Sequence, residues 1–189
     1  MRIRTLSAAM LVVSALAASA SAQTHGEPED FTAFAIASDN LGSGAGTVRL
    51  SVDRWATEAE RDRLITTLRE KGPRAMMEVL QDMRRAGYIR TSDSLGHPLY
   101  FAHQTVGEDG GREIMIVTDR PIGFWEAWEN SRSTEYRFMV VQMKIAGDGR
   151  GTGTLSDATK ILAYGDIIEL ENFTTSPIRL TRIQASKDE

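Results

Sequence analysis

The sequence contains no cysteine and only three histidines among its 189 residues. Without cysteine the chain can form no disulfide, no thiolate metal site and no thiol nucleophile. The histidines stand at His25, His97 and His103, so the close pairs that bind zinc in motifs such as His-Glu-x-x-His are missing. We therefore expect no metal site.

Motifs of cofactor-binding and hydrolytic enzymes are also missing. The glycine-rich run 42–46 leads into an expected strand, so no helix N-terminus would face a bound phosphate. Ser38-Asp39-Asn40 matches one motif of penicillin-interacting serine enzymes, but their Ser-x-x-Lys and Lys-Thr-Gly motifs do not occur. We expect no cofactor.

A long apolar stretch occurs only near the N-terminus. Arg2 and Arg4 precede the apolar residues 6–16, and Ala20-Ser21-Ala22 supplies a small-x-small cleavage pattern. This order predicts a signal peptide over residues 1–22, removed before Gln23. The alternative is a retained anchor, but a spanning helix needs roughly 20 predominantly apolar residues and this stretch is shorter. We expect a periplasmic or secreted protein with no membrane span after cleavage.

The composition of the remaining chain indicates an acidic, folded protein. Without Arg2 and Arg4, 20 of the 22 basic residues remain against 26 acidic ones, a net charge of −6. Such a charge argues against nucleic acid as a partner. A hydrophobic content of 41% argues against disorder. We expect a flexible lead-in over residues 23–30 and a single domain over residues 31–189.

Two consecutive helices are predicted in the first half of the chain. Thr57 followed by Glu60 forms a capping-box pattern, and apolar residues recur at helical spacing after it. Gly72-Pro73 should end the first helix and begin a second that continues to Arg85. These segments predict an αα-hairpin.

Most of the other segments have β character, with alternating apolar and polar residues separated by glycine-rich turns. Residues 31–37 form a first apolar run, and the predicted strands are 48–52, 99–106, 112–118, 137–145, 153–164, 167–173 and 178–183. Short connections favour antiparallel pairing, because parallel strands need long crossovers. We therefore predict an α+β domain, an antiparallel meander with the αα-hairpin packed on one face.

The segment 119–129 is the densest candidate for function, because it holds two of the three tryptophans. Aromatic faces beside carboxylates and an arginine can bind sugars, amines or flat polar ligands. The candidate ligand-binding residues are Arg120, Phe124, Trp125, Glu126 and Trp128. Alternatively, the aromatic residues form one helical turn that covers the core.

The same segment offers carboxylates for acid–base chemistry. Glu126 and Glu129 lie three residues apart and would face one way on a helix, with Asp119 and Arg120 nearby. That spacing is also typical of a solvated acidic edge.

Three stretches carry a resemblance to known proteins: Gly87–Thr91 with Ser94–Gly96, Thr118–Glu126, and Leu170–Phe173 with Pro177–Thr181. They resemble an uncharacterised family of exported bacterial proteins with no assigned function, and the similarity extends over residues 46–183. The resemblance implies bacterial export and a single domain, and no activity.

These observations favour a non-catalytic extracytoplasmic protein that binds a small ligand or a cell-envelope partner. The first alternative is a hydrolase or isomerase that uses carboxylates. The second is a structural or assembly protein.

Overall fold

The computed structural model describes residues 26–39, 42–91, 96–107, 110–119, 135–165, 167–172 and 177–187. These ranges contain ten strands and one helix. The elements are β1 (Glu29–Asp39), β2 (Gly42–Val52), α1 (Glu58–Gln81), β3 (Gly87–Thr91), β4 (His97–Leu99), β5 (Phe101–Val106), β6 (Arg112–Asp119), β7 (Phe138–Ile145), β8 (Arg150–Tyr164), β9 (Ile167–Asn172) and β10 (Ile178–Lys187).

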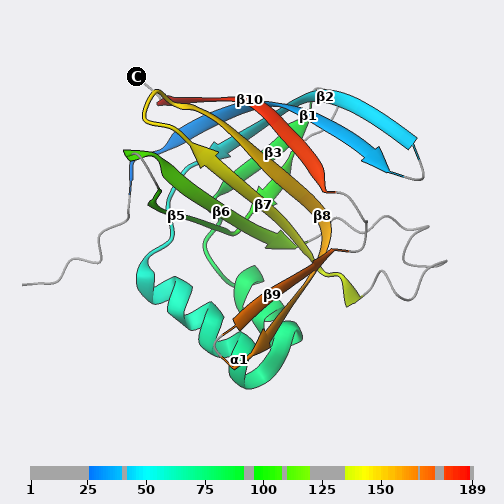
Figure 1. Cartoon of the computed structure of the whole chain (residues 1–189). Coiled ribbons are helices and arrows are strands. Elements are labelled where there is room, and N and C mark those ends of the chain that lie inside the picture. Colours follow the sequence, from blue (N-terminus) through cyan, green and yellow to red (C-terminus); the bar gives the residue numbers. More distant parts are fainter. Residues whose placement is uncertain are drawn as a thin grey trace, which may run out of the picture.

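The strands form one antiparallel sheet that curls into a nearly closed barrel (Figure 1). The strand order is β4-β3-β2-β1-β10-β8-β7-β6-β5, and β9 pairs with β8 outside this path. The two ends of the order, β4 and β5, are separated in the chain only by Tyr100. Across this seam the Thr118 hydroxyl on β6 donates a hydrogen bond of 2.8 Å to the Pro98 carbonyl on β4. The chain itself therefore joins the two ends of the sheet.

The barrel interior is packed with apolar side chains at alternate strand positions. On β7, Met139, Val141 and Met143 point inward, whereas Phe138 and Val140 point to the outer face. This alternation follows from the period of two residues in a strand. The barrel is thus filled by its own side chains.

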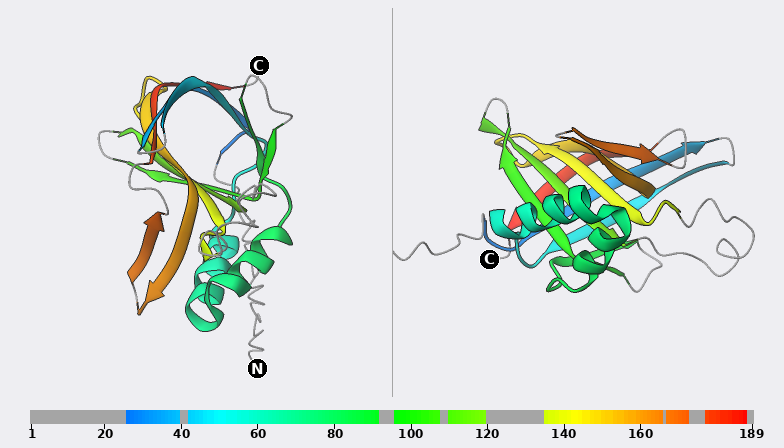
Figure 2. Two further views of the ribbon diagram at one scale, coloured as in Figure 1. Left: turned by 90° about the vertical axis from the view of Figure 1, so that its right-hand side faces the viewer. Right: turned by 90° about the horizontal axis from the view of Figure 1, so that it is seen from below.

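Helix α1 packs on the outer face of the strands that follow it in the chain (Figure 2, right). Leu64 and Leu68 on α1 belong to the same buried cluster as Phe138 on β7 and Ile161 on β8. The apolar residues that recur at helical spacing in the sequence thus pack against the barrel. A second core lies between the helix and the barrel wall.

The predicted fold class, an α+β domain with an αα-hairpin, is wrong. The structure is mostly antiparallel β with one helix. Only Gly72 leaves the helical conformation, with φ 82° and ψ −178°, and Pro73 continues the same bent helix. A helical hairpin needs a connection of about two to five residues. The sheet also buries its inner face by curling on itself instead of packing that face on helices.

The predicted strand positions are largely confirmed. One predicted strand divides at Tyr100, and β1 and β3 form where no strand was predicted. The run 42–46, expected to lead into a strand, is itself the first half of β2. There Gly44 pairs with Ala37 and Gly46 with Ala35 of β1. Glycine weakens a strand, but here the backbone hydrogen bonds of the long β1–β2 hairpin keep the run extended.

The predicted capping box at the start of α1 is confirmed. The Glu60 backbone N–H donates to Thr57 Oγ1 at 3.2 Å, and the Thr57 N–H donates to Glu60 Oε2 at 2.9 Å. Arg54 Nη1 donates to the same carboxylate oxygen at 2.9 Å. Partial burial raises the pKa of Glu60, but the bonds from Arg54 and Thr57 outweigh it and leave the pKa below its usual value. The carboxylate therefore stays ionised at neutral pH.

Replacing Thr57 by alanine is expected to lower the free energy of unfolding by about 1 kcal/mol, because the Glu60 N–H loses its acceptor. Thr66→Ala is the matched control, since Thr66 is exposed on the same helix. Its change should be small, because alanine is the better helix former. Urea denaturation of both variants measures the difference. Equal changes would show that the cap contributes nothing.

Candidate functional site

The residues predicted to bind ligand lie outside the described part of the chain. Arg120, Phe124, Trp125, Glu126 and Trp128 all belong to residues 120–134, as does Glu129. Whether these side chains come together therefore stays a prediction.

Asp119, at the end of β6, is the described residue of that candidate segment. Its carbonyl oxygen and Oδ1 lie 2.8 Å and 3.0 Å from His97 Nε2 on β4. Gln81 Nε2 at the end of α1 donates to Oδ2 at 3.2 Å. Asp119 thus joins the helix to the barrel seam, and these contacts give it a structural role.

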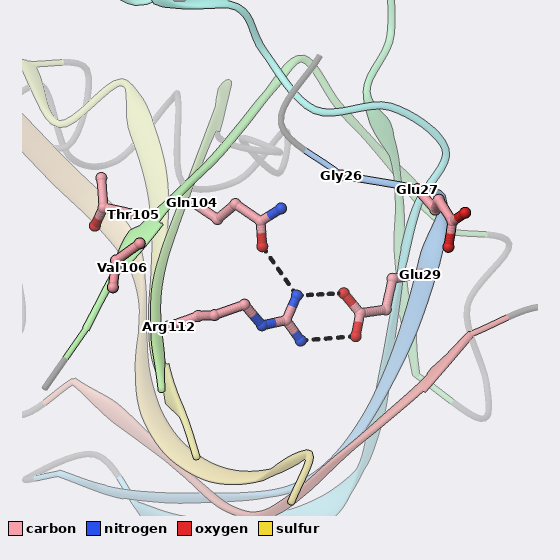
Figure 3. Close-up of a pocket in the computed structure, with 7 residues that line it drawn as sticks. All are labelled: Gly26, Glu27, Glu29, Gln104, Thr105, Val106 and Arg112. Carbon is pink, nitrogen blue, oxygen red and sulfur yellow. Dashed lines mark hydrogen bonds and ion pairs between the residues drawn. The ribbon is translucent and has the colours of Figure 1, made fainter. Parts of the chain in front are cut away.

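A different set of residues forms a pocket of about 290 Å³ at one end of the barrel (Figure 3). The set combines charged, polar and apolar side chains from the start of β1, from β5 and from β6. The lining residues are Gly26, Glu27, Glu29, Gln104, Thr105, Val106 and Arg112. We refer to this pocket as the barrel mouth.

An ion pair crosses the barrel mouth. Arg112 Nη1 lies 2.7 Å from Glu29 Oε2, and Nη2 lies 2.8 Å from Oε1. Nη1 also donates to Gln104 Oε1 at 2.9 Å. Figure 3 shows the guanidinium and the carboxylate facing each other in one plane. Such a two-pronged pair is stronger and more directional than a single hydrogen bond.

Strand alternation places both charged side chains inside the barrel. Phe31 on β1 and Ile114 on β6 belong to the interior core, so Glu29 and Arg112, two residues before them, point the same way. Strands β1 and β6 are separated in the sheet by β10, β8 and β7. The pair therefore bridges opposite walls and closes the end of the core.

Burial of this pair is unequal. Glu29 is only 5% exposed, whereas the Arg112 side chain is 31% exposed. The hydrogen bond to Glu29 is the main reason that the pKa of the Arg112 guanidinium rises, and it outweighs the opposing effect of burial. The guanidinium is therefore held as a permanent cation, and its accessible part faces solvent at the mouth.

The chain before β1 forms the wall opposite β5. Trp55 Nε1 donates to the Glu27 carbonyl at 2.8 Å, which fixes this segment over the core. Gly26 has φ +128°, and a Cβ there would lie 2.4 Å from Gln104 Nε2 and 2.8 Å from Trp55 Nε1. Only glycine fits this conformation and this spacing. The wall is therefore closely packed.

The barrel mouth can hold a ligand through hydrogen bonds and a rim contact. The side chains of Gln104 and Arg112 contain an amide and a guanidinium, and Val106 on the rim is 90% exposed. Within the described ranges no group of three or more metal-binding side chains occurs. Nor does any described helix have the length and apolarity to cross a bilayer.

This site was not predicted from the sequence, although strand alternation indicates that Arg112 points to the same face as the apolar residue Ile114. Glu29 falls in the predicted flexible lead-in, and Arg112 falls at the start of a predicted strand. The two residues are 83 positions apart. No local pattern pairs positions so distant, because their contact depends on the closure of the barrel.

Comparisons with known proteins assign no family, since no family model, curated protein or solved structure matches the chain.

Proposed function

We propose that the protein is a non-catalytic extracytoplasmic binding protein and that the barrel mouth holds its ligand, a small polar molecule. The observation that carries this proposal is a pocket whose floor is the Glu29–Arg112 ion pair with Gln104 attached to it. Ligand sites are typically concave, with apolar walls and a few convergent polar groups. The location outside the cytoplasm rests on the signal-peptide pattern of residues 1–22 and on the resemblance to exported bacterial proteins.

The size of the pocket limits the ligand. A volume of about 290 Å³ lies at the lower end of the roughly 300–1,000 Å³ of ligand sites. Such a pocket suits a molecule the size of an amino acid or a monosaccharide. The amide of Gln104 can donate to such a ligand and accept from it. The exposed Val106 can cover an apolar part of it.

Binding without catalysis is favoured by the state of the charged groups. Both oxygens of the Glu29 carboxylate are already engaged by the Arg112 guanidinium, so neither is turned toward a ligand in the pocket. The guanidinium cannot give up a proton at ordinary pH. Neither member of the pair suits acid–base catalysis, whereas both suit a fixed polar surface.

A thermal-shift screen of the chain from Gln23 to Glu189 against free amino acids and monosaccharides tests the proposal. A ligand present at 100 times its dissociation constant stabilises the folded state by about 2.7 kcal/mol, so its binding raises the melting temperature. Val106→Trp should weaken binding of any such compound at least tenfold, because the indole would fill the mouth. Isothermal titration measures the affinities.

Met115→Trp is the matched control. Met115 lies on the outer face of β6 and is 39% exposed, so this variant adds the same side chain away from the pocket. Its affinity should equal that of the wild type. A screen without any stabilising compound would contradict the proposal. So would a compound that binds both variants equally.

A further inference from the structure

Strands β8 and β9 extend beyond the barrel as a two-stranded ribbon (Figure 2, left). Pairing of β8 with β7 ends at Thr159, opposite Phe138. Beyond that point β8 pairs with β9, from Thr159 opposite Asn172 to Tyr164 opposite Ile167. Within the sheet, the ribbon is therefore joined to the barrel through β8.

The outer edge of β9 has no strand beside it in the described part of the chain. The two end strands of the curled sheet, β4 and β5, follow each other in the chain on either side of Tyr100, and one hydrogen bond, from Thr118 to Pro98, crosses the seam beside them. An unpaired edge presents a row of backbone N–H and C=O groups that can pair with another extended chain.

This edge carries only part of the usual protection against such pairing. Natural edge strands carry proline, bulges or charged residues, lysine above all, that block the approach of another strand, and the charged residues of β9 are two glutamates. The sequence of β9, Ile-Ile-Glu-Leu-Glu-Asn, contains no proline or lysine, and its pairing with β8 has no register shift. Large apolar side chains are exposed at the tip of the ribbon: Tyr164 is 59% exposed, Ile167 70% and Ile168 40%.

The charges beside this edge are negative. Glu169 is exposed, and no described cation forms an ion pair with it. Glu171 accepts a hydrogen bond of 2.5 Å from the Tyr136 hydroxyl. Lys160, the residue opposite Glu171 on β8, already contacts Glu135 at 3.2 Å. A strand added at this edge would gain from a lysine or arginine beside Glu169.

We propose that β9 binds an extended, basic segment of a partner protein by strand addition. Backbone hydrogen bonds would supply much of the affinity. The partner's side chains would supply the specificity, with an apolar residue beside Ile167 and a lysine or arginine beside Glu169. A second copy of this chain is a poorer occupant. Antiparallel pairing of β9 with itself centred on Glu169 places glutamate opposite glutamate, and the strand contains no cation for either.

Fluorescence anisotropy with a labelled ten-residue peptide of alternating lysine and isoleucine tests this inference. The peptide should bind the mature chain at least tenfold more tightly than a peptide with glutamate in place of lysine. Glu169→Lys should weaken the binding of the lysine peptide at least tenfold. Glu70→Lys makes the same change of charge at an exposed position of α1 and should leave the affinity nearly unchanged.

Hydrogen exchange separates strand addition from attraction by overall charge. Bound lysine peptide should slow the exchange of those β9 amides that do not bond to β8. Binding that leaves β9 exchange unchanged, or that both charge variants weaken equally, would overturn the inference. A concentration-dependent dimer that protects β9 would also overturn it, since the occupant would then be a second copy. None of these readouts depends on a ligand at the barrel mouth.

Discussion

Replacing Arg112 by methionine is expected to lower the free energy of unfolding by about 2–4 kcal/mol. Glu29 is 5% exposed and would lose the guanidinium that holds both of its oxygens at 2.7 Å and 2.8 Å. The carboxylate must then stay charged without its partner, take up a proton or draw water into the mouth. Because Arg112 is partly exposed, the expected loss of unfolding free energy is smaller than for a fully buried ion pair. Urea denaturation at pH 7 measures it.

Glu113→Gln is the control for this experiment. Glu113 is the next residue on β6, points outward and contacts Lys144 at 3.1 Å in an exposed ion pair. Exposed pairs contribute at most about 1 kcal/mol, so its loss should be small. The double variant Glu29→Leu with Arg112→Met should recover much of the lost stability, because no buried charge remains. Equal losses for Arg112→Met and Glu113→Gln would show that the pair does not hold the barrel end.

Replacing Gly87 by alanine is expected to destabilise the protein by about 3 kcal/mol. Gly87 begins β3 and pairs with Val52 of β2. A Cβ at this position would lie 1.8 Å from the backbone carbonyl oxygen of Ser51. Because the obstacle is backbone, it cannot turn away as a side chain could, so β3 must separate from β2. The melting temperature and the urea midpoint measure the loss.

Gly46→Ala is the matched control, since it makes the same change in β2 where a Cβ meets no atom within 4 Å. Its stability should equal that of the wild type or rise by up to about 1 kcal/mol, because alanine restricts the unfolded chain more than glycine does. Equal stability of Gly87→Ala and Gly46→Ala would show that β2 and β3 do not approach each other closely at Gly87.

Local features of this protein could be predicted from its residues. The hydroxyl of Thr57 and the carboxylate of Glu60 lie three positions apart, and their reciprocal bonds need only one turn of helix. The strand positions followed from alternation and from glycine-rich turns in the same way. Both kinds of signal act between residues close in sequence, so neither depends on the rest of the fold.

The architecture could not be predicted in this way. Strand β7 has a nearly unbroken apolar run over Phe138–Val141, which indicates burial on both faces but not what covers each face. The predicted fold covered one face of the sheet with a helical hairpin. In the structure one face packs on α1 and the other on the opposite wall of the barrel. Either arrangement would satisfy the same pattern of side chains.

The sequence by itself determined the location of most strands, the start of the helix and the absence of thiol chemistry. These depend on neighbouring residues or on composition. Only the tertiary structure decided that the sheet curls and that Glu29 meets Arg112 across its open end. That contact forms because the three strands that lie between β1 and β6 in the sheet, β10, β8 and β7, set their distance and direction when they pair, and no stretch of sequence contains that information.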